Sequence, residues 1–495
     1  MNEQDSNMST QVKDLRTFLA QVKERFPDEL VHVRRDVDLK FEVSAVLVKL
    51  DRAHKFPIVI FDNLASASGG RSAFPLLSNL FASRNLCALS LDSSVEKVGL
   101  DYDRRTQNAK TPVVVGRDQA PVKQVVKKGE DINLFDFPVP LPYHMEGGRT
   151  ILGSVVTTVD NQEGTVYNCA YQTLRVLEPR RATVGLGEQT GNWERYRERV
   201  AATGEGLPVV AWIGHHPAAC MGALTRVSLD VDEYGVIGGA LGEPLRVTPS
   251  ETWGDKFLVP ADAEIVIEGV IPPKERGRHG LRADFARYYS PETLRPVIDV
   301  KAITYRRDAI YHDIHLGGRD QDHLGGIPLE GSIYRAVRQA VPTVKNVHLP
   351  SSGCSRFHAY VQIKKTGAGQ GREAIVAALS VDRRLKHIVV VDEDIDIFDD
   401  ADVLWAVATR SRWDRDMVVL PNMASTTRDP TAYASGSSEL AYHSYTVAKG
   451  GIDATMPAPP EPFEIRIKVP DEVMRKAELK DYLGADQLAK IPLDA

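Results

Sequence analysis

The chain has 495 residues, of which 43% are hydrophobic and 26% charged, and its formal net charge is −6. Because domains usually hold about 100–200 residues, this length predicts two to four domains with ample core. A slightly acidic chain argues against a nucleic-acid partner, and no apolar run reaches the roughly 20 residues that cross a membrane. The polar N-terminus lacks a signal-peptide core, so we expect a cytoplasmic protein.

The first 117 residues alternate between helical and strand-like patterns. Apolar residues recur at helical spacing over 11–25 and predict an amphipathic helix. The apolar runs FPIVIFDN at 56–63 and LCALSLDSS at 86–94 are typical of buried strands. This mixture predicts an N-terminal α/β domain over residues 1–117.

The middle of the chain, residues 118–325, is rich in β-branched residues. Runs such as GSVVTTVD and LPVVAWIG predict strands, and the alternation in AEIVIEGVI at 263–271 predicts a half-buried one. We therefore expect a β-rich, barrel-like domain. Helical and strand patterns alternate again over 326–495, with helices predicted at 331–342 and in the tail at 471–491, which indicates a C-terminal α/β domain.

Three features of the sequence allow both a binding and a structural interpretation. GAGQGRE at 367–373 is either a phosphate loop or a turn, and its spacing is not that of a dinucleotide site. DEDIDIFDD at 392–400 is either a cation loop or a helix cap before Ala401. Four separated cysteines without a CxxC pair predict reduced, partly buried thiols, neither disulfides nor zinc ligands: Cys87, Cys169, Cys220 and Cys354.

Histidines and acid–base residues gather at two places. His215 and His216 are adjacent, and on a strand they would point to opposite faces, so they seldom bind one metal together. The stretch RGRHGLRADFARYY offers a histidine and a carboxylate that could share proton transfer, with arginines that could hold a carboxylate. A salt-bridged surface loop is the alternative. No HExxH, GxSxG or catalytic cysteine signature supports hydrolysis.

Eight motifs, in order, resemble the UbiD family of decarboxylases from about residue 14 to residue 460. They are DFPVP…EGGRT (136–150), YNCAYQTLR (167–175), GHHPAACMGA (214–223), DEYGVIGGAL (232–241), VPADAEIVIEGVI (259–271), TYRRDAIYH (304–312), DEDIDIFDDADVLWAVATR (392–410) and KGGIDATMP (449–457). The resemblance implies an N-terminal α/β domain, a β-barrel-like flavin-binding domain and a C-terminal α/β domain that dimerises.

The resemblance also implies cofactors and partners. The family binds prenylated flavin mononucleotide, supplied by a flavin prenyltransferase, with its phosphate bridged to Mn²⁺ or Mg²⁺ and with K⁺ nearby. Asn168 and Glu233 match two metal ligands, whereas the family histidine falls near GEQTGNW, which contains Gln189 and Asn192 but no histidine. The residues implied in cofactor binding are Asn168, Gln172, Thr173, Gln189, Met221 and Glu233. The implied assembly is a homodimer or a multiple of it.

The catalytic residues depart from the family pattern. The family arginine falls on Thr173, and Arg175 lies two residues on, on the same face of a regular strand. The family's two acids fall on His279 and Asp284. The resemblance implies that Arg175 or Arg287 holds the substrate carboxylate.

The same resemblance assigns proton transfer. Asp284 would protonate the product carbon, which requires that burial against Phe285 and Tyr288 raise the pKa of its carboxyl group. His279 would orient Asp284 or contact the substrate. The flavin would act as an electron sink when CO₂ leaves.

The sequence therefore predicts reversible, non-oxidative decarboxylation of an aromatic, heteroaromatic or α,β-unsaturated carboxylic acid. Histidine at the first acid position favours a heteroaromatic or hydroxylated aromatic acid. Two alternatives stay open. One is a non-catalytic flavin- or metal-binding chaperone of the same fold, and the other is a nucleotide-dependent oxidoreductase that uses GAGQG.

Overall fold

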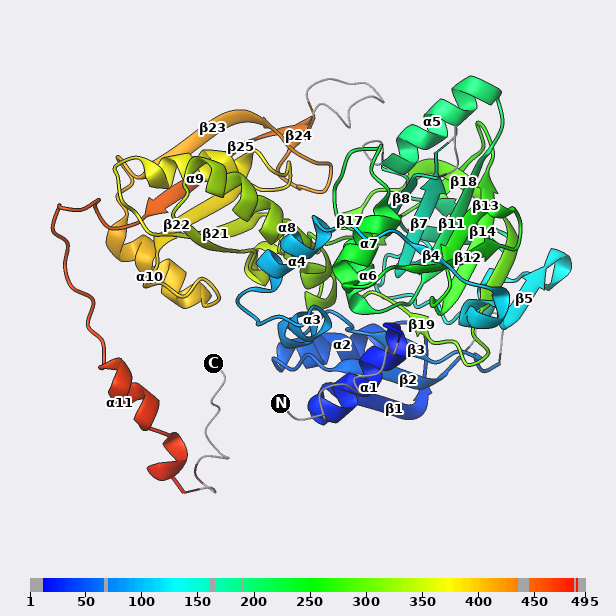
Figure 1. Cartoon of the computed structure of the whole chain (residues 1–495), viewed down its shortest axis with the longest axis horizontal. Coiled ribbons are helices and arrows are strands. Elements are labelled where there is room, and N and C mark those ends of the chain that lie inside the picture. The colour runs from blue at the N-terminus through cyan, green and yellow to red at the C-terminus, as the bar shows by residue number, and fades with distance from the viewer. Residues whose placement is uncertain are drawn as a thin grey trace, which may run out of the picture.

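The computed structural model describes residues 12–65, 70–160, 165–187, 191–434, 445–484 and 487. Figure 1 shows three groups of elements: the N-terminal helices and strands at the bottom, a curled sheet on the right and a C-terminal α/β layer on the left. The predicted multi-domain α/β class is confirmed. No described helix is both long and apolar enough to span a membrane.

The N-terminal domain is built on a four-stranded sheet in the order β1-β2-β3-β19. Its helix α1 begins with a capping box, in which the Asp14 side chain accepts a hydrogen bond from the backbone N–H of Thr17. The last strand comes from far along the chain and pairs in parallel with β3. The elements are α1 (Leu15–Arg25), β1 (Leu30–Val37), α2 (Glu42–Arg52), β2 (Ile58–Leu64), β3 (Leu76–Ser78), α3 (Arg84–Ser90), α4 (Val98–Thr106) and β19 (Tyr311–His312).

The prediction of a strand at 86–94 is wrong, because most of these residues lie in the helix α3. Leu86, Cys87 and Ala88 are all buried there. A helix covered on all sides has no polar face, so its short apolar run resembles that of a buried strand.

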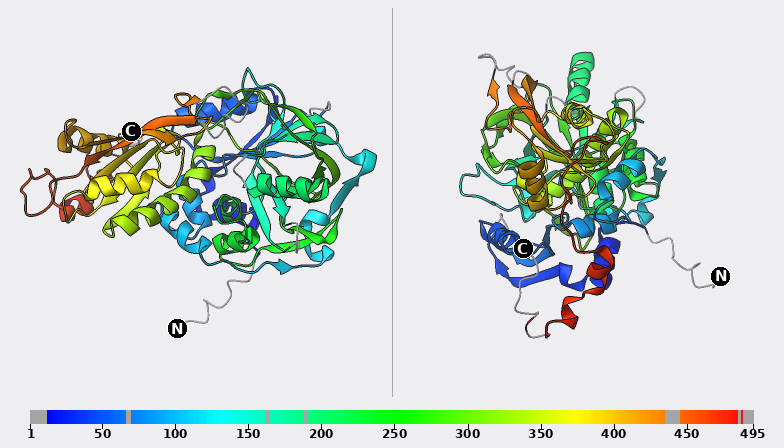
Figure 2. Two further views of the ribbon diagram at one scale, coloured as in Figure 1. Left: turned by 90° about the horizontal axis from the view of Figure 1, so that it is seen from above. Right: turned by 90° about the vertical axis from the view of Figure 1, so that its left-hand side faces the viewer.

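A ten-stranded sheet in the order β6-β9-β10-β18-β14-β11-β7-β8, with β5 and β15 also paired to β18, forms the central domain. Figure 2 shows its curl from above. Among the described residues no ladder joins β6 to β8, so the barrel-like sheet stays open. Its strands are β5 (Val125–Lys128), β6 (Thr150–Ile151), β7 (Ser154–Val159), β8 (Tyr167–Tyr171), β9 (Leu174–Glu178), β10 (Arg181–Val184), β11 (Leu207–Ile213), β14 (Ile265–Ile271), β15 (Arg276–His279) and β18 (Thr293–Tyr305).

Smaller elements surround this sheet. They are β4 (Val113–Val114), α5 (Gly191–Thr203), α6 (Pro217–Gly222), α7 (Glu233–Leu241), β12 (Arg246–Ser250), β13 (Gly254–Pro260), and the β16 (Arg282–Ala283) and β17 (Tyr289–Ser290) hairpin. The prediction that β14 is half-buried is wrong, because core clusters lie against both of its faces. The charged residue Glu268 made one face of this strand look exposed in the sequence. In the structure Glu268 is buried and accepts hydrogen bonds from the Ser250 hydroxyl and the Thr252 N–H.

The C-terminal domain is a six-stranded sheet in the order β20-β21-β22-β25-β23, with β24 paired to β25. The helix predicted at 331–342 begins earlier, since α8 runs unbroken across the predicted boundary at residue 325. The tail predicted as helical at 471–491 contains only the short α11 and a 3-10 turn up to residue 484; residues 485, 486 and 488–491 lie outside the described part. The elements are α8 (Arg319–Ala340), β20 (Val344–His348), β21 (His358–Ile363), α9 (Gln370–Leu379), β22 (His387–Asp392), α10 (Asp400–Arg410), β23 (Met417–Ala424), β24 (Tyr433–Ala434), β25 (Tyr445–Ala454) and α11 (Asp471–Lys476).

Candidate active site

Asn168 and Glu233, predicted as metal ligands, lie in contact. Asn168 comes from β8, and Glu233 is the first residue of α7, which Asp232 caps through the N–H groups of Tyr234 and Gly235. The Asn168 side-chain N–H donates to one Glu233 carboxylate oxygen over 2.8 Å, and the Cys169 backbone N–H donates to the other. Both side chains are buried. The helix start and the strand therefore bring two oxygen-bearing side chains together beneath the surface.

This pair fits a divalent cation. Burial raises the pKa of Glu233 to about 8 against the opposing effects of two hydrogen bonds and the charge of Arg195, so the ionised carboxylate is incompletely compensated. The side-chain oxygen of Asn168 is buried and has no hydrogen-bond partner among the described residues. A cation binding both oxygens would remedy both deficits. A cluster of three or more His, Cys, Asp or Glu suited to a metal does not occur in the described part of the chain.

The third metal ligand is not settled by the segment that replaces the family histidine. Gln189 lies outside the described residues. Asn192 is committed elsewhere, because its oxygen accepts from the Thr158 hydroxyl over 2.7 Å and its N–H₂ donates to the Val156 carbonyl over 2.8 Å. Asn192 therefore anchors α5 to β7.

His279 is buried between two threonines. Its Nε2 lies 3.0 Å from the Thr173 hydroxyl and its Nδ1 lies 2.9 Å from the Thr183 hydroxyl. Burial, reinforced by the positive charge of Arg282, lowers the pKa of His279 to about 3. The ring is therefore neutral at physiological pH, and since both nitrogens are engaged by threonines it does not hydrogen-bond Asp284. Of its two predicted roles, the one through Asp284 is wrong.

The buried neutral state of His279 has a measurable consequence for stability. A histidine whose pKa is lower in the folded than in the unfolded protein contributes stability above its unfolded pKa, near 6.5, and this is lost as pH falls toward 3. We expect His279→Gln to remove up to about 3 kcal/mol of the stability loss between pH 7 and pH 4. Thermal unfolding across this range measures it, with exposed His32→Gln as control. An acid dependence like that of the wild type in His279→Gln would contradict a buried neutral ring.

Arg175, from β9, contacts the backbone next to His279. Its guanidinium donates to the carbonyl oxygens of Gly147 and Gly280. A side chain at Gly147 or Gly148 would collide with that guanidinium, which explains the paired glycines of EGGRT. Two of the five guanidinium N–H groups are used in this way, so the others remain to bind a carboxylate.

Asp284 is buried in the β16–β17 hairpin, but the expected rise of its pKa is wrong. Its Oδ2 lies 3.0 Å from the Arg428 guanidinium and 3.3 Å from that of Arg282, and it accepts from the Ser290 hydroxyl over 2.9 Å. Burial alone would raise the pKa of Asp284. The charges of Arg428 and Arg282 and the hydrogen bonds lower it by more than burial raises it, so the net shift is downward. Tyr288 is mostly exposed and does not wall the carboxyl group. Asp284 is an ionised carboxylate in this arrangement.

The remaining predicted residues lie around these groups. Arg287 is exposed, has a left-handed backbone (φ 61°) and points its guanidinium to within 3.6 Å of the Asp322 carboxylate. The Gln172 side chain is buried, and the backbone carbonyl of Gln172 accepts from the Ser154 hydroxyl over 2.7 Å. Met221 is fully buried in α6.

Three residues at this site were not predicted: Glu146, Thr183 and Arg428. Glu146 accepts a hydrogen bond from the Ala283 N–H over 2.8 Å and faces the charges of Arg282 and Arg175. Glu146 stands inside the conspicuous motif EGGRT, which was an available signal. Thr183 and Arg428 stand in no motif, so nothing in the sequence marked them.

The motifs with two interpretations take the structural one. The Gln370 side chain accepts from the N–H groups of Thr366 and Gly367 and so closes the glycine loop on itself. Asp399 caps α10 through the Ala401 N–H, and Asp392 binds Arg410. The histidine pair lies in the turn before α6, not on a strand, and His216 caps that helix. All four cysteines are free thiols, as predicted.

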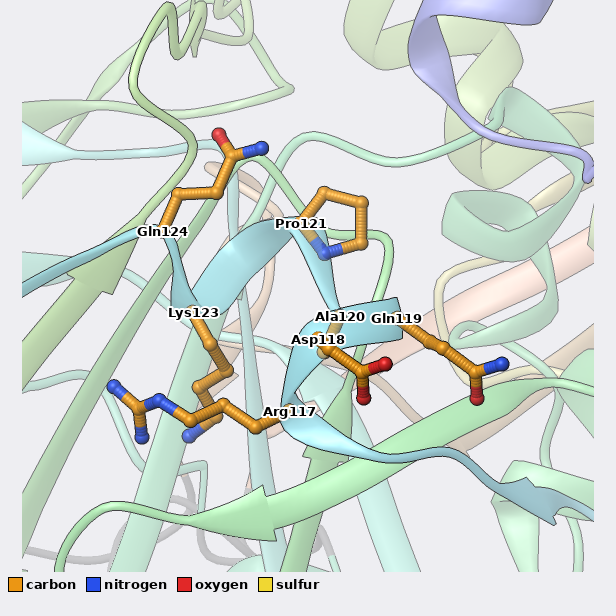
Figure 3. A pocket seen from close by; sticks show the side chains of 7 residues that line it. All are labelled: Arg117, Asp118, Gln119, Ala120, Pro121, Lys123 and Gln124. Atoms are coloured by element: carbon orange, nitrogen blue, oxygen red, sulfur yellow. The ribbon is translucent and has the colours of Figure 1, made fainter.

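A hollow of about 520 Å³ lies away from these motifs and is lined by residues 117–121, 123 and 124. Figure 3 shows Arg117 and Lys123 extending to one side of it. The Lys123 ammonium lies 3.6 Å from Glu251 and 3.7 Å from Glu268, so its charge is balanced within the protein. None of the predicted site residues lines this hollow.

Comparison with known proteins matches the whole domain order. Residues 24–102, 113–319 and 322–454 match the N-terminal, Rift-related and C-terminal domains of 3-octaprenyl-4-hydroxybenzoate carboxy-lyase, UbiD. The chain is 33% identical over 445 residues to anhydromevalonate phosphate decarboxylase of Methanothermobacter thermautotrophicus, covering 90% of this chain and 97% of that protein.

Solved structures agree. The UbiD-class enzyme HmfF from Pelotomaculum thermopropionicum, in complex with FMN, superposes with a TM-score of 0.85 at 34% identity, covering 95% of this chain and 100% of that one. An evolved dimeric form of the same enzyme with prFMN gives a TM-score of 0.83 at 33% identity, with the same coverage. With every domain matched in order and a relative spanned almost end to end, the chain belongs to the UbiD family of decarboxylases.

Proposed function

We propose that the protein catalyses reversible, non-oxidative decarboxylation of an aromatic, heteroaromatic or α,β-unsaturated carboxylic acid, using prenylated FMN with Mn²⁺ or Mg²⁺ and K⁺. The observation that carries this proposal is the pairing of two clusters along β8. Asn168 and Glu233 lie at its start, and Thr173 with His279 lie just past its end. At about 3.3 Å per residue, the five steps from residue 168 to residue 173 span roughly 16 Å, comparable with an extended flavin mononucleotide.

Each cluster suits one part of this chemistry. Asn168 and Glu233 would hold the metal that binds the flavin phosphate. The bound prenylated flavin would supply an electron sink when CO₂ departs. His279 would contact the substrate. Because its ring is neutral, it would not repel a cationic group next to it. Residues proposed to contact the cofactor besides the metal ligands are Gln172, Thr173, Gln189 and Met221.

The arginines would bind the substrate carboxylate. Arg175 is fixed by two carbonyl groups and keeps donors free, and Arg287 is exposed beside the same hairpin. Asp284 would then protonate the carbon that has lost CO₂. Such a cationic rim around a neutral histidine favours an anionic substrate over a neutral one.

The test is turnover after co-expression with a flavin prenyltransferase. The purified protein should be yellow and should release CO₂ from at least one member of a panel of aromatic, heteroaromatic and acrylic acids that includes anhydromevalonate phosphate. It should also exchange solvent deuterium into the matching product. A yellow protein that is inactive on every acid and in every exchange assay would support the alternative of a non-catalytic flavin-binding chaperone.

We also propose that the C-terminal arm, residues 457–484, assembles the protein as a homodimer or a multiple of it. The arm leaves the C-terminal sheet and places α11 apart from the body (Figure 1). Arg466 anchors it, since its guanidinium binds Asp402 over 2.6 Å and stacks on Trp405. Ile465 and Ile467, on either side of this anchor, are 94% and 95% exposed. Apolar side chains so fully exposed are typical of a surface that a second copy covers.

Replacing both isoleucines tests this assembly. We expect the Ile465→Asp/Ile467→Asp double variant to become monomeric by light scattering at concentrations where the wild type is dimeric or larger. Two buried isoleucines contribute about 3–6 kcal/mol, enough to dissociate a moderate dimer. Glu464→Gln, on the same segment, should keep the wild-type mass. A wild type that is a clean monomer would contradict the proposal.

A further inference from the structure

The proposed proton donor, Asp284, is ionised by a residue from another domain. Arg428 follows β23 in the C-terminal domain, yet its guanidinium lies 3.0 Å from Asp284 and also donates to the Ser290 hydroxyl. Asp284 and Ser290 both belong to the central-domain hairpin. A carboxylate clamped in this way cannot give up a proton that it does not hold.

The loop that carries Arg428 is tied to the sheet of the C-terminal domain. Its neighbour Asp429 accepts from the Thr431 N–H over 2.9 Å and binds the Lys386 ammonium at 3.1 Å. Lys386 immediately precedes β22. The position of Arg428 therefore reports the position of the whole C-terminal domain.

The two domains are joined by a helix with a weak point. In α8, Leu324 and Ile327 belong to the core shared with the central domain, whereas Ile333 and Val337 belong to the C-terminal core. Pro328 stands between these two pairs, inside the helix. Proline removes one helical hydrogen bond and crowds the preceding turn, which is a recognised place for a helix to bend.

Other contacts between the central domain and the C-terminal domain include one aromatic pair and one ion pair. The rings of Phe285 in the hairpin and Phe357 lie 5.5 Å apart, and Arg226 binds Asp382 at 2.9 Å. An ion pair with one exposed partner contributes about 0–1 kcal/mol and an aromatic pair about 0.5–1.5 kcal/mol, so these two contacts oppose separation only modestly. After Pro328, the buried pair Arg84–Glu330 also ties α8 to the N-terminal domain.

We infer that Arg428 is a positioning residue for the proton donor: docked, it holds Asp284 as a carboxylate, and when it withdraws with the C-terminal domain Asp284 takes up the proton that it delivers. This inference rests on the proposed function. In the delivery step the O–H bond of Asp284 breaks as a C–H bond forms at the carbon that has lost CO₂. The carboxylate left behind binds Arg428 again, and solvent supplies the next proton.

Other charges near Asp284 stay in place when Arg428 leaves. Arg282 remains 3.3 Å away on the same hairpin. The charged or titratable groups on or around this hairpin include Glu146, His144, Arg175, His279, Arg282, Arg295, Asp322, Arg356 and Arg428. Arg428 is the member of this set whose guanidinium contacts Asp284 from the C-terminal domain, so its removal isolates the proposed effect.

The experiment compares the wild-type flavin-loaded protein with Arg428→Gln and Arg428→Lys by infrared titration of ¹³C-labelled aspartate, with Asp284→Asn subtracted to isolate the Asp284 signal. An opposite charge this close lowers a carboxyl pKa by about 1–3 units. At a fixed pH above the midpoint, Arg428→Gln should therefore raise the protonated fraction of Asp284 at least about tenfold, and Arg428→Lys should do so less. Arg226→Gln, which breaks a different contact between the same domains, is the matched control.

Kinetics supply the second readout. In Arg428→Gln the alkaline limb of the kcat profile should move to higher pH, while KM changes less than about threefold because Arg428 does not hold the substrate. An unchanged infrared titration in Arg428→Gln, or an equal shift in Arg226→Gln, would overturn the assignment. The titration needs no substrate, so failure of the proposed decarboxylation appears separately, as absence of CO₂ release from the wild type.

Discussion

Asp284→Asn should lose about 10²–10⁴-fold in turnover while still binding flavin, which is the usual contribution of a general acid. The asparagine keeps the shape of the side chain and its place beneath Ser290, but it carries no transferable proton. Exchange of solvent deuterium into the product should fall in parallel, since both directions use the same proton. Turnover and exchange rates, with flavin absorbance as the measure of loading, test this expectation.

Two comparisons make the result for Asp284→Asn decisive. Glu292 is a neighbouring, exposed carboxyl group that lies 3.6 Å from the Arg278 guanidinium. Its replacement, Glu292→Gln, should keep near-normal turnover. If Asp284→Asn is nearly normal and His279→Gln is dead, the histidine is the acid despite its low pKa. If both variants are active, the hairpin is a salt-bridged surface and the active-site assignment is wrong.

Glu233→Gln should sharply lower flavin occupancy and metal affinity. Loss of groups that only support metal ligands costs 10–100-fold in affinity, so loss of a proposed ligand charge should cost at least about that much. Dialysis against Mn²⁺, followed by metal analysis and flavin absorbance, measures both. Unchanged occupancy and activity would refute the assignment, and Asp230→Asn, an exposed acid in the preceding loop, serves as control.

The same variant should also change how stability depends on pH in metal-free protein. A carboxyl group whose folded pKa is about 8 contributes stability below its unfolded pKa, near 4.5, and this is lost as pH rises to 8. The wild type should therefore lose up to about 4 kcal/mol between pH 5 and pH 8 relative to Glu233→Gln. Added Mn²⁺ should restore the wild type and leave the variant unchanged.

Much of the fold followed from patterns that are local in the sequence. The helix α1 was predicted from apolar spacing, and β2 and β11 from short β-branched runs, because each of these elements presents its own periodicity. The helix α3 was missed because burial on all sides removes that periodicity. The open edge between β6 and β8 depends on how distant strands meet, which no local pattern records.

The site divides in the same way. Asn168, Glu233, His279 and Asp284 were found because they stand in motifs that resemble a family, and the first two lie in contact as expected. Their electrostatics were not predictable. The threonines that engage both nitrogens of His279 are about 100 residues away in sequence, and Arg428, which lowers the pKa of Asp284, reaches Ser290 across 138 residues. A pKa depends on such neighbours, so the sequence suggested a protonated Asp284 where the fold holds it ionised.

The strand β19 bears on how the chain is made. The N-terminal sheet stays incomplete until the ribosome has delivered Tyr311 and His312, which cover the open side of β3. Until then β3, which contains the apolar residues Leu76 and Leu77, has an unpaired edge, and such an edge readily pairs with other chains. The sheet of the domain synthesised first is therefore completed only after most of the central domain has been made, so this edge is exposed to aggregation for that part of translation.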